Sequence, residues 1–217
     1  MVDVEVEKRL AADVAAQLVQ DGMLVGLGTG TTVTFLLEAI ARRGPRASFV
    51  ASSPRTYEAA QSLGLRVDEF DDVARLDLAI DGADQITPDG WLVKGGGGAH
   101  TREKIVAAAA ERFVVIADSS KITDALHAPV PLELSPFGLA ATISQLESCE
   151  VRQSPHSPDG GVIADYWGAV SGPDELAQWF SSIPGVIAHG LFAPELVSEL
   201  LVCQGSHVHR TVIGGTP

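Results

Sequence analysis

Residues 94 to 121 read KGGGGAHTREKIVAAAAERFVVIADSSK, and this stretch contains three successive elements of the fold. Gly95 to Gly98 form a loop without Cβ atoms, so its backbone can adopt positive φ and come close to a ligand. The segment Thr101–Arg112 is rich in alanine and other strong helix formers. The apolar run Phe113–Asp118 is typical of a strand buried on both faces. The stretch therefore predicts a glycine loop, a helix and a buried strand, in the order expected of an α/β protein.

The same stretch predicts an anion site. A glycine loop that leads into a helix N-terminus directs backbone N–H groups and the positive end of the helix dipole at a ligand. Three of the chain's four lysines, Lys94, Lys104 and Lys121, lie in this stretch, although the formal net charge of the chain is −13. We therefore expect a local positive pocket for an anionic ligand on an otherwise acidic surface.

Composition excludes several classes of protein. The chain has 217 residues, of which 46% are hydrophobic and 20% charged, as in a globular protein able to bury a core. The acidic balance argues against nucleic acid or an anionic membrane as a partner. No apolar run is long enough to span a bilayer, and the charged start MVDVEVEKRL is unlike a signal peptide. We expect a cytoplasmic location, with Cys149 and Cys203 reduced.

Outside the quoted stretch the chain repeats a strand, turn and helix pattern. Apolar residues at helical spacing predict a helix over 6–18. The strand Met23–Gly28 then leads through Gly26-Leu-Gly-Thr-Gly-Thr-Thr32 into a second helix, marked by apolar residues from Val33 to Ile40. A further strand, Ser48–Ser53, precedes a helix with Ser53 as N-cap, Pro54 as first residue and Gly64 as its end. Two more strands are predicted over 65–70 and 76–80.

This alternation predicts an open, mostly parallel Rossmann-like sheet flanked by helices. The turn Thr87–Gly90 predicts a hairpin that ends at Lys94. After His127 the prolines interrupt the pattern, and we expect a smaller α+β domain with a strand at 162–167 and a helix at 174–182. The expected domains are 1–127 plus 200–217, with the strand Leu200–Cys203 and a frayed tail from Gly214, and an inserted domain of 128–199.

Polar motifs follow the predicted strands at their carboxyl ends, where open parallel sheets bind ligands. Asp81 to Asp84 follow the strand 76–80, the glycine turn follows Met23–Gly28, and Ser119 to Lys121 follow Phe113–Asp118. Each motif alone has a plain structural explanation: a tight turn, a helix cap, or for Glu103 a favourable acid in a first helical turn. Together they predict one site with carboxylates, lysines and glycine loops.

Other readings of these motifs are disfavoured. The dinucleotide fingerprint G-x-G-x-x-G fails at Thr31, and no Lys-Ser/Thr pair follows these glycines as in a Walker loop. His207-x-His209 lacks a third ligand, so we expect no metal. His100 is expected to be a solvated loop residue. Nucleophilic serine chemistry is disfavoured because no His–Asp relay is evident for Ser52, Ser53, Ser119 or Ser120.

Four motifs, in order and at matching spacing, resemble those of the ribose-5-phosphate isomerase type A family. Three short motifs in the second domain are also similar, so the resemblance spans nearly the whole chain. The first four are Gly28-Thr-Gly-Thr-Thr32, Asp81-Gly-Ala-Asp84, Lys94 to Ala99 with Thr101-Arg-Glu-Lys104, and Ile116 to Lys121; the others are Pro136-Phe-Gly138, Ile183-Pro-Gly-Val186 and Gly190-Leu-Phe192.

The resemblance implies a homodimer that interconverts ribose 5-phosphate and ribulose 5-phosphate through an ene-diolate, without cofactor or metal. It implies Glu103 as the proton-shuttling base, with Asp81, Asp84 and Lys94 as further catalytic residues. The residues that it implies for substrate binding are Thr29, Gly30, Thr31, Thr32, Asp81, Gly82, Ala83, Asp84, Lys94, Gly95, Gly96, Gly97 and Lys121.

The residue chemistry agrees with this implication, since such an isomerase needs one carboxylate to carry a carbon-bound proton and donors for the developing negative charge. Ring opening could involve Asp81 or Asp84. Two alternatives stay open: a non-catalytic sugar-phosphate sensor, and a coenzyme A transferase relative with Glu103 as nucleophile. The sequence departs from the family at Gln85, where Glu is usual, and at His100, where an apolar residue is common.

Overall fold

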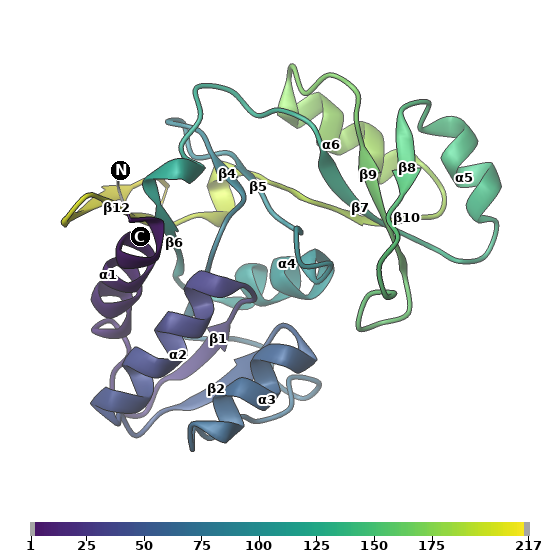
Figure 1. Cartoon of the computed structure of the whole chain (residues 1–217). Helices are drawn as coiled ribbons and strands as arrows, with labels where there is room; N and C mark the ends of the chain where they lie inside the picture. Colours follow the sequence, from purple (N-terminus) through teal and green to yellow (C-terminus); the bar gives the residue numbers. More distant parts are fainter. Residues whose placement is uncertain (1–2, 215–217) are drawn as a thin grey trace. The chain divides into compact units, whose positions relative to one another are not determined.

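The computed structural model describes residues 3–214 and divides the chain into two compact units (Figure 1). The first unit consists of residues 3–83, 102–121 and 194–214, and the second of residues 84–101 and 122–193. The chain therefore passes from one unit to the other four times, and neither unit is a continuous stretch of sequence.

The first unit is built on a six-stranded sheet in the order β13-β12-β6-β3-β1-β2. All neighbours are parallel except β13, which runs antiparallel to β12. Parallel strands end at the same edge of a sheet, so the residues after β1, β3 and β6 gather there. The strands are β1 (Leu24–Leu27), β2 (Ser48–Ala51), β3 (Leu78–Asp81), β6 (Phe113–Asp118), β12 (Glu199–Gln204) and β13 (His207–Val212).

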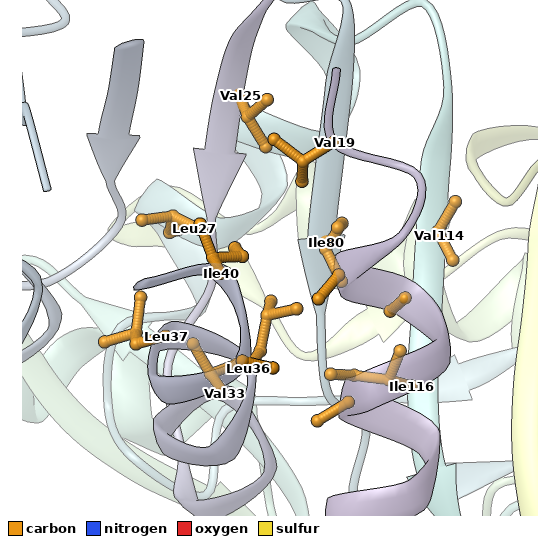
Figure 2. Packing of buried hydrophobic residues seen from close by; sticks show 14 of the residues in the cluster. Val19, Val25, Leu27, Val33, Leu36, Leu37, Ile40, Ile80, Val114 and Ile116 are labelled. Atoms are coloured by element: carbon orange, nitrogen blue, oxygen red, sulfur yellow. The ribbon is translucent and has the colours of Figure 1, made fainter. Parts of the chain in front are cut away.

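Helices α1 (Val4–Ala16) and α2 (Thr31–Arg43) cover one face of this sheet. Successive side chains of a strand point to opposite faces of the sheet, so every second residue faces these helices. Examples are Val25 and Leu27 of β1 and Val114 and Ile116 of β6. Figure 2 shows these side chains meeting the apolar stripe of α2, which includes Leu36 and Ile40. Burial of this apolar surface is the main stabilising term for the first unit.

The helix α4 (His100–Ala109) approaches β1 closely at Gly26, where a Cβ atom would lie 2.4 Å from Val106 Cγ1. Only glycine allows this approach of helix to strand. The helix α3 (Pro54–Ser62) follows β2; its N-cap Ser53 accepts a hydrogen bond from the Thr56 N–H at 3.2 Å. Ser53 and Pro54 therefore begin the helix as the sequence predicts.

The second unit contains a four-stranded antiparallel sheet in the order β10-β7-β9-β8 and a three-stranded antiparallel sheet in the order β11-β5-β4. Helices α5 (Leu139–Gln145) and α6 (Pro173–Ser182) contribute to its own apolar core, which contains Leu132, Ala164 and Phe180. The strands are β4 (Gln85–Ile86), β5 (Leu92–Val93), β7 (Val130–Leu134), β8 (Cys149–Val151), β9 (Val162–Tyr166), β10 (Val186–His189) and β11 (Leu191–Phe192).

The open parallel sheet and the hairpin before the glycine run are confirmed, but the strand predicted over 65–70 is wrong. Only Val67 makes an isolated parallel bridge there, to Phe49. Five strands were missed: β7, which contains Pro131, the short strands β8, β10 and β11, and β13, whose side chains are mostly exposed. The tail expected from Gly214 lies mostly outside the described residues.

The division into units differs from the expected boundaries of 1–127 plus 200–217 and 128–199. Residues 84–101 and 122–127 belong to the second unit, and residues 194–199 to the first. The physical reason is sheet pairing: β4 and β5 pair with each other and β5 pairs with β11 of the second unit, while β12 already begins at Glu199. Periodicity along the chain does not reveal such pairing between distant segments.

Candidate active site

The first glycine turn joins β1 to α2 at the carboxyl edge of the parallel sheet. Gly30, with φ 119°, is the N-cap of α2, and within residues 3–214 no side chain caps this helix start. The first N–H groups of a helix have no partner inside the helix and are positioned to bind an anion. Thr31 and Thr32 are the first residues of α2, so the expected anion loop lies at a helix N-terminus.

Asp81, the last residue of β3, holds this turn in place. Its Oδ1 accepts hydrogen bonds from the Thr29 N–H at 3.0 Å and from the Gly82 N–H at 2.7 Å. A Cβ atom on Gly28 would lie 1.8 Å from Asp81 Cγ, so residue 28 must be glycine for Asp81 to lie there. Two motifs separated by 52 positions in the sequence are thus joined by a direct hydrogen bond.

Lys121 ends the 3₁₀ helix η1 (Ser119–Lys121), which follows β6, the neighbour of β3. Glu7 on α1 anchors this helix: its fully buried carboxylate accepts hydrogen bonds from the Ser119 N–H and hydroxyl, both at 2.8 Å, and from the Gly205 N–H. Burial alone would raise the pKa of Glu7, but these hydrogen bonds outweigh it and hold the pKa below its ordinary value.

Lys8 was missed at the sequence level. Its Nζ donates to Thr31 Oγ1 at 3.1 Å, which places its ammonium group beside the anion loop. The scarcity of lysine was the available signal, since only four occur in the chain. Its position on α1, far from the motifs in sequence, concealed it.

Glu103 lies in the first turn of α4 and its side chain is only 4% exposed. A carboxylate at a helix start is favoured as an anion by the helix dipole. Lys104, the next residue, was expected to add positive charge to the pocket. Burial lowers its pKa to about 7, however. The positive charge expected from three lysines in this stretch is therefore reduced at neutral pH.

Lys94 follows β5 in the second unit and is 3% exposed. Its N–H donates to Gly190 O at 2.8 Å, and its ammonium lies 5.5 Å from the centroid of the Phe192 ring. An aromatic face at this distance attracts a cation and helps to hold it in an apolar setting. The lysine is thus fixed at its backbone and supported along its side chain.

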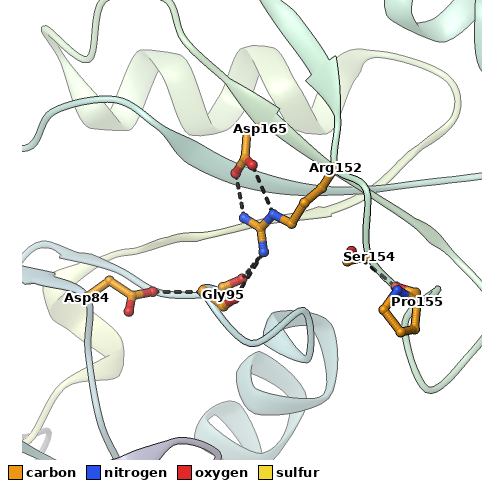
Figure 3. Close-up of polar contacts among 7 residues, drawn as sticks. Asp84, Gly95, Arg152, Ser154, Pro155 and Asp165 are labelled. Atoms are coloured by element: carbon orange, nitrogen blue, oxygen red, sulfur yellow. Dashed lines mark hydrogen bonds and ion pairs between the residues drawn. The ribbon is translucent and has the colours of Figure 1, made fainter.

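Asp84 and the glycine loop are joined within the second unit (Figure 3). Asp84 Oδ2 accepts a hydrogen bond from the Gly96 N–H at 2.8 Å, and Arg152 Nη1 donates to Gly95 O at 3.2 Å and to Gly96 O at 3.1 Å. Arg152 also binds the carboxylate of Asp165. Gly95 and Gly98 adopt φ of 106° and 72°, which explains the choice of glycine at both positions.

The structure corrects one expectation about the departures from the family and explains the other. His100 is fully buried and is not a solvated residue: a Cβ atom on Gly95 would lie 2.7 Å from its Nδ1. Gln85 donates to His127 O at 2.7 Å and accepts from the His127 N–H at 2.8 Å. A carboxylate could not donate the first of these bonds, so Gln85 suits this packing better than Glu.

The structure thus groups the expected residues in two sets. The first unit holds Thr29 to Thr32, Asp81 to Ala83, Glu103 and Lys121, and the second holds Asp84 and Lys94 to Gly97. The chain connects them at the junctions 83/84 and 101/102. Among residues 3–214 no group of three or more His, Cys, Asp or Glu side chains could hold a metal ion. In the same range, no helix combines the length and apolar character needed to cross a membrane.

Comparison with known proteins identifies the family. Residues 48–206 match the family model described as ribose 5-phosphate isomerase A (phosphoriboisomerase A). A ribose-5-phosphate isomerase A of Rhodopseudomonas palustris is 41% identical over 94% of this chain and 96% of its own length.

Two solved structures are similar over nearly the whole chain. Ribose 5 phosphate isomerase A from Neisseria gonorrhoeae is 30% identical, with a TM-score of 0.94 over 99% of both chains. A D-ribose-5-phosphate isomerase in complex with phospho-erythronic acid is 30% identical, with a TM-score of 0.91 over 97% of this chain and 99% of that one. The chain, with its parallel sheet, glycine loops and buried glutamate, belongs to the ribose 5-phosphate isomerase A family.

Proposed function

We propose that this protein interconverts D-ribose 5-phosphate, an aldose phosphate, and D-ribulose 5-phosphate, a ketose phosphate. The reaction is an isomerisation in which no oxidant is consumed. The observation that carries the proposal is the carboxylate of Glu103, buried in the first turn of α4 directly after the glycine loop. The names of the relatives and of the two solved structures support the substrate.

In the proposed reaction Glu103 takes the proton from C2 of the open-chain aldose and returns it to C1. Removal of this proton leaves an ene-diolate, with negative charge on the oxygens of C1 and C2. A second proton moves from the oxygen of C2 to that of C1, so that the ketose forms without an oxidant or reductant. Proton transfer by one positioned carboxylate typically contributes about 10²–10⁴-fold in rate.

Lys94 supplies the positive charge that the ene-diolate requires, together with the glycine-loop N–H groups other than those of Gly96 and Gly98, which donate to Asp84 and to Gly95 O. Donors that are already oriented before the reaction stabilise developing charge without reorganisation. Lys94 is buried, held by its backbone and supported by Phe192. The ligand of one related structure, phospho-erythronic acid, supports this view, because its carboxylate shares negative charge between two oxygens in one plane, as the ene-diolate does across C1 and C2.

The phosphate group is assigned to the start of α2. Gly30 to Thr32 present the N-terminal N–H groups of the helix, and Lys8 lies beside them through its bond to Thr31. Lys121 lies at the same sheet edge, after β6. Helix N-termini and lysine point charges are common phosphate ligands, so this arrangement suits the dianion.

Asp81 and Asp84 are proposed both to shape the two loops and to serve ring opening. Each uses one carboxylate oxygen to accept a loop N–H group, from Thr29 and Gly96 respectively. In the proposed ring opening these carboxylates exchange a proton with the sugar hydroxyls.

The decisive experiment is Glu103→Gln. We expect turnover of ribose 5-phosphate to fall by about 10²–10⁴-fold, with ligand binding retained, because the amide cannot take the C2 proton. Exchange of the C2 proton with deuterium oxide, followed by NMR, should fall in parallel. The matched control is Glu111→Gln, an exposed carboxylate two residues after the end of α4, which should keep full activity.

Two outcomes would sink this proposal. Unchanged turnover in the Glu103→Gln variant would remove Glu103 from its role. A wild-type protein that binds ribose 5-phosphate without converting it would indicate a sensor. The expected homodimer and cytoplasmic location stay predictions; sedimentation of the purified protein tests the first of these.

A further inference from the structure

We propose that Arg152, oriented by Asp165, is a positioning residue that sets the direction of the glycine-loop N–H groups, an inference that rests on the proposed isomerase activity. Arg152 follows β8 and Asp165 lies on β9, so neither belongs to the motifs that indicate the family. Their side chains are only 23% and 15% exposed.

The guanidinium group of Arg152 is itself fixed. Its Nε donates to Asp165 Oδ2 at 2.9 Å, while its Nη2 binds Oδ1 of the same carboxylate. The Arg152 backbone N–H also donates to Ile163 O at 2.9 Å. A bidentate pair of this kind fixes the plane of the guanidinium group and leaves Nη1 with a defined direction. Figure 3 shows Nη1 directed at the glycine loop.

Arg152 and Asp84 hold the same peptide group from opposite sides. The peptide between Gly95 and Gly96 carries Gly95 O, which accepts from Arg152, and the Gly96 N–H, which donates to Asp84. In a planar trans peptide these two atoms point in opposite directions. The two side chains therefore fix both the position and the rotation of this peptide plane.

The next peptide follows from the same rule. Arg152 Nη1 also binds Gly96 O at 3.1 Å, so the Gly97 N–H, on the same peptide plane, must point away from Arg152. Consecutive glycines have no side chains to restrict φ and ψ, and such a loop would otherwise sample many conformations. The hydrogen bonds from Arg152 thus restrict a loop whose own sequence leaves it flexible.

This role requires arginine. The guanidinium group offers five N–H donors in a planar fork, and here it serves a carboxylate and two carbonyl oxygens at once. A lysine ammonium at this position can keep the charge but not this geometry. The alternative is a purely structural ion pair between β8 and β9, which would affect stability without any specific effect on the loop.

The test is the pair of variants Arg152→Lys and Asp165→Asn, with Thr142→Val as the control. Thr142 donates to Pro184 O at 3.2 Å in the same unit, more than 40 positions from the glycine loop in sequence. We expect Arg152→Lys to lower kcat for ribose 5-phosphate by about 10²-fold, because small displacements of catalytic groups are that costly. Inhibition by inorganic phosphate, assigned to the first unit, should be unchanged.

Hydrogen exchange of the Gly96 N–H gives a second, independent readout. Exchange should be faster by about 10-fold or more in Arg152→Lys and Asp165→Asn, and unchanged in Thr142→Val. If both folded variants keep wild-type kcat and Gly96 exchange, the inference is overturned; if Arg152→Lys does not fold, Asp165→Asn decides. If the wild type does not isomerise, the proposed function fails, and Gly96 exchange still decides the inference about Arg152.

Discussion

Gly28 and Asp81 show how one missing side chain determines the geometry of the first loop. Asp81 occupies the space that a Cβ atom on residue 28 would need, and its Oδ1 holds the Thr29 N–H. The loop conformation therefore requires that residue 28 has no Cβ atom, because the Asp81 carboxylate occupies that space.

The variant Gly28→Ala should be destabilised by about 1–3 kcal/mol, as expected for an overpacked core position. Asp81 must move to admit the new methyl group and would release the Thr29 N–H, so turnover should fall as well. Urea denaturation and steady-state kinetics measure the two effects. Gly214→Ala, whose Cβ would lie 3.9 Å from Pro194 O, is the control and should behave as the wild type.

Lys104 predicts a pH dependence of stability at the level of one residue. Its pKa of about 7 in the folded protein lies below the ordinary value of about 10.4. The unfolded chain therefore binds more protons between these values, and the free energy of unfolding should rise with pH from about 7 to about 10. In Lys104→Met this rise should be smaller, whereas the exposed control Arg55→Met should retain it; an equal rise in both variants would contradict the assignment.

At the scale of elements, Glu7 connects α1 with η1 and with the turn between β12 and β13. The neighbouring residue Lys8 reaches Thr31, and η1 ends in Lys121. One buried carboxylate thus supports the two lysines that we assign to the phosphate. No motif contains Glu7, which is why sequence reasoning did not find it.

Glu7→Gln should lower the free energy of unfolding at pH 7 by about 1–3 kcal/mol, because the amide leaves a buried donor unpaired. The pKa of Glu7 is lowered in the fold from 4.5, so the stability it contributes is complete above that value and is lost as pH falls through the folded pKa. The difference between wild type and variant should therefore shrink below pH 4.5. Glu5→Gln, exposed on the same helix, is the control; a difference that persists in acid would count against the role of Glu7.

Sequence reasoning succeeded for elements with a strong local signal and failed where distant pairing decides. Ser53 and Pro54 begin α3 because capping is local. The residues 65–70 alternate as a strand would, yet only Val67 has a bridge partner. Pro131 disfavoured a strand, yet β7 lies between β9 and β10, because its pairing partners come from residues far along the chain.

The sequence predicted the contact between the first glycine turn and Asp81. It did not predict the side chains that hold the second glycine loop in place. Strand ends and glycine turns placed Thr29 and Asp81 at one sheet edge, and the structure joins them by a hydrogen bond. Arg152 and Asp165 could not be found this way, because an arginine after one short strand and an aspartate on the next carry no signal of a shared target. Such supports become visible only in three dimensions.

At the scale of the whole molecule, each unit has its own apolar core. Phe180→Ala should destabilise the second unit by about 3–5 kcal/mol, since a buried aromatic ring is replaced by a cavity. Hydrogen exchange should become faster in β7 and β9, while β3 and β6 remain protected. Equal loss of protection in all four strands would show that the two units unfold as one.

The position of β12 between β6 and β13 has a consequence for synthesis of the chain. Because β12 begins only at Glu199, a nascent chain leaves one edge of β6 unpaired until residues 199–204 have been made. An unpaired edge of a largely apolar strand is a site for aggregation. A nascent chain that has not yet reached residue 199 should therefore be prone to aggregate through this edge.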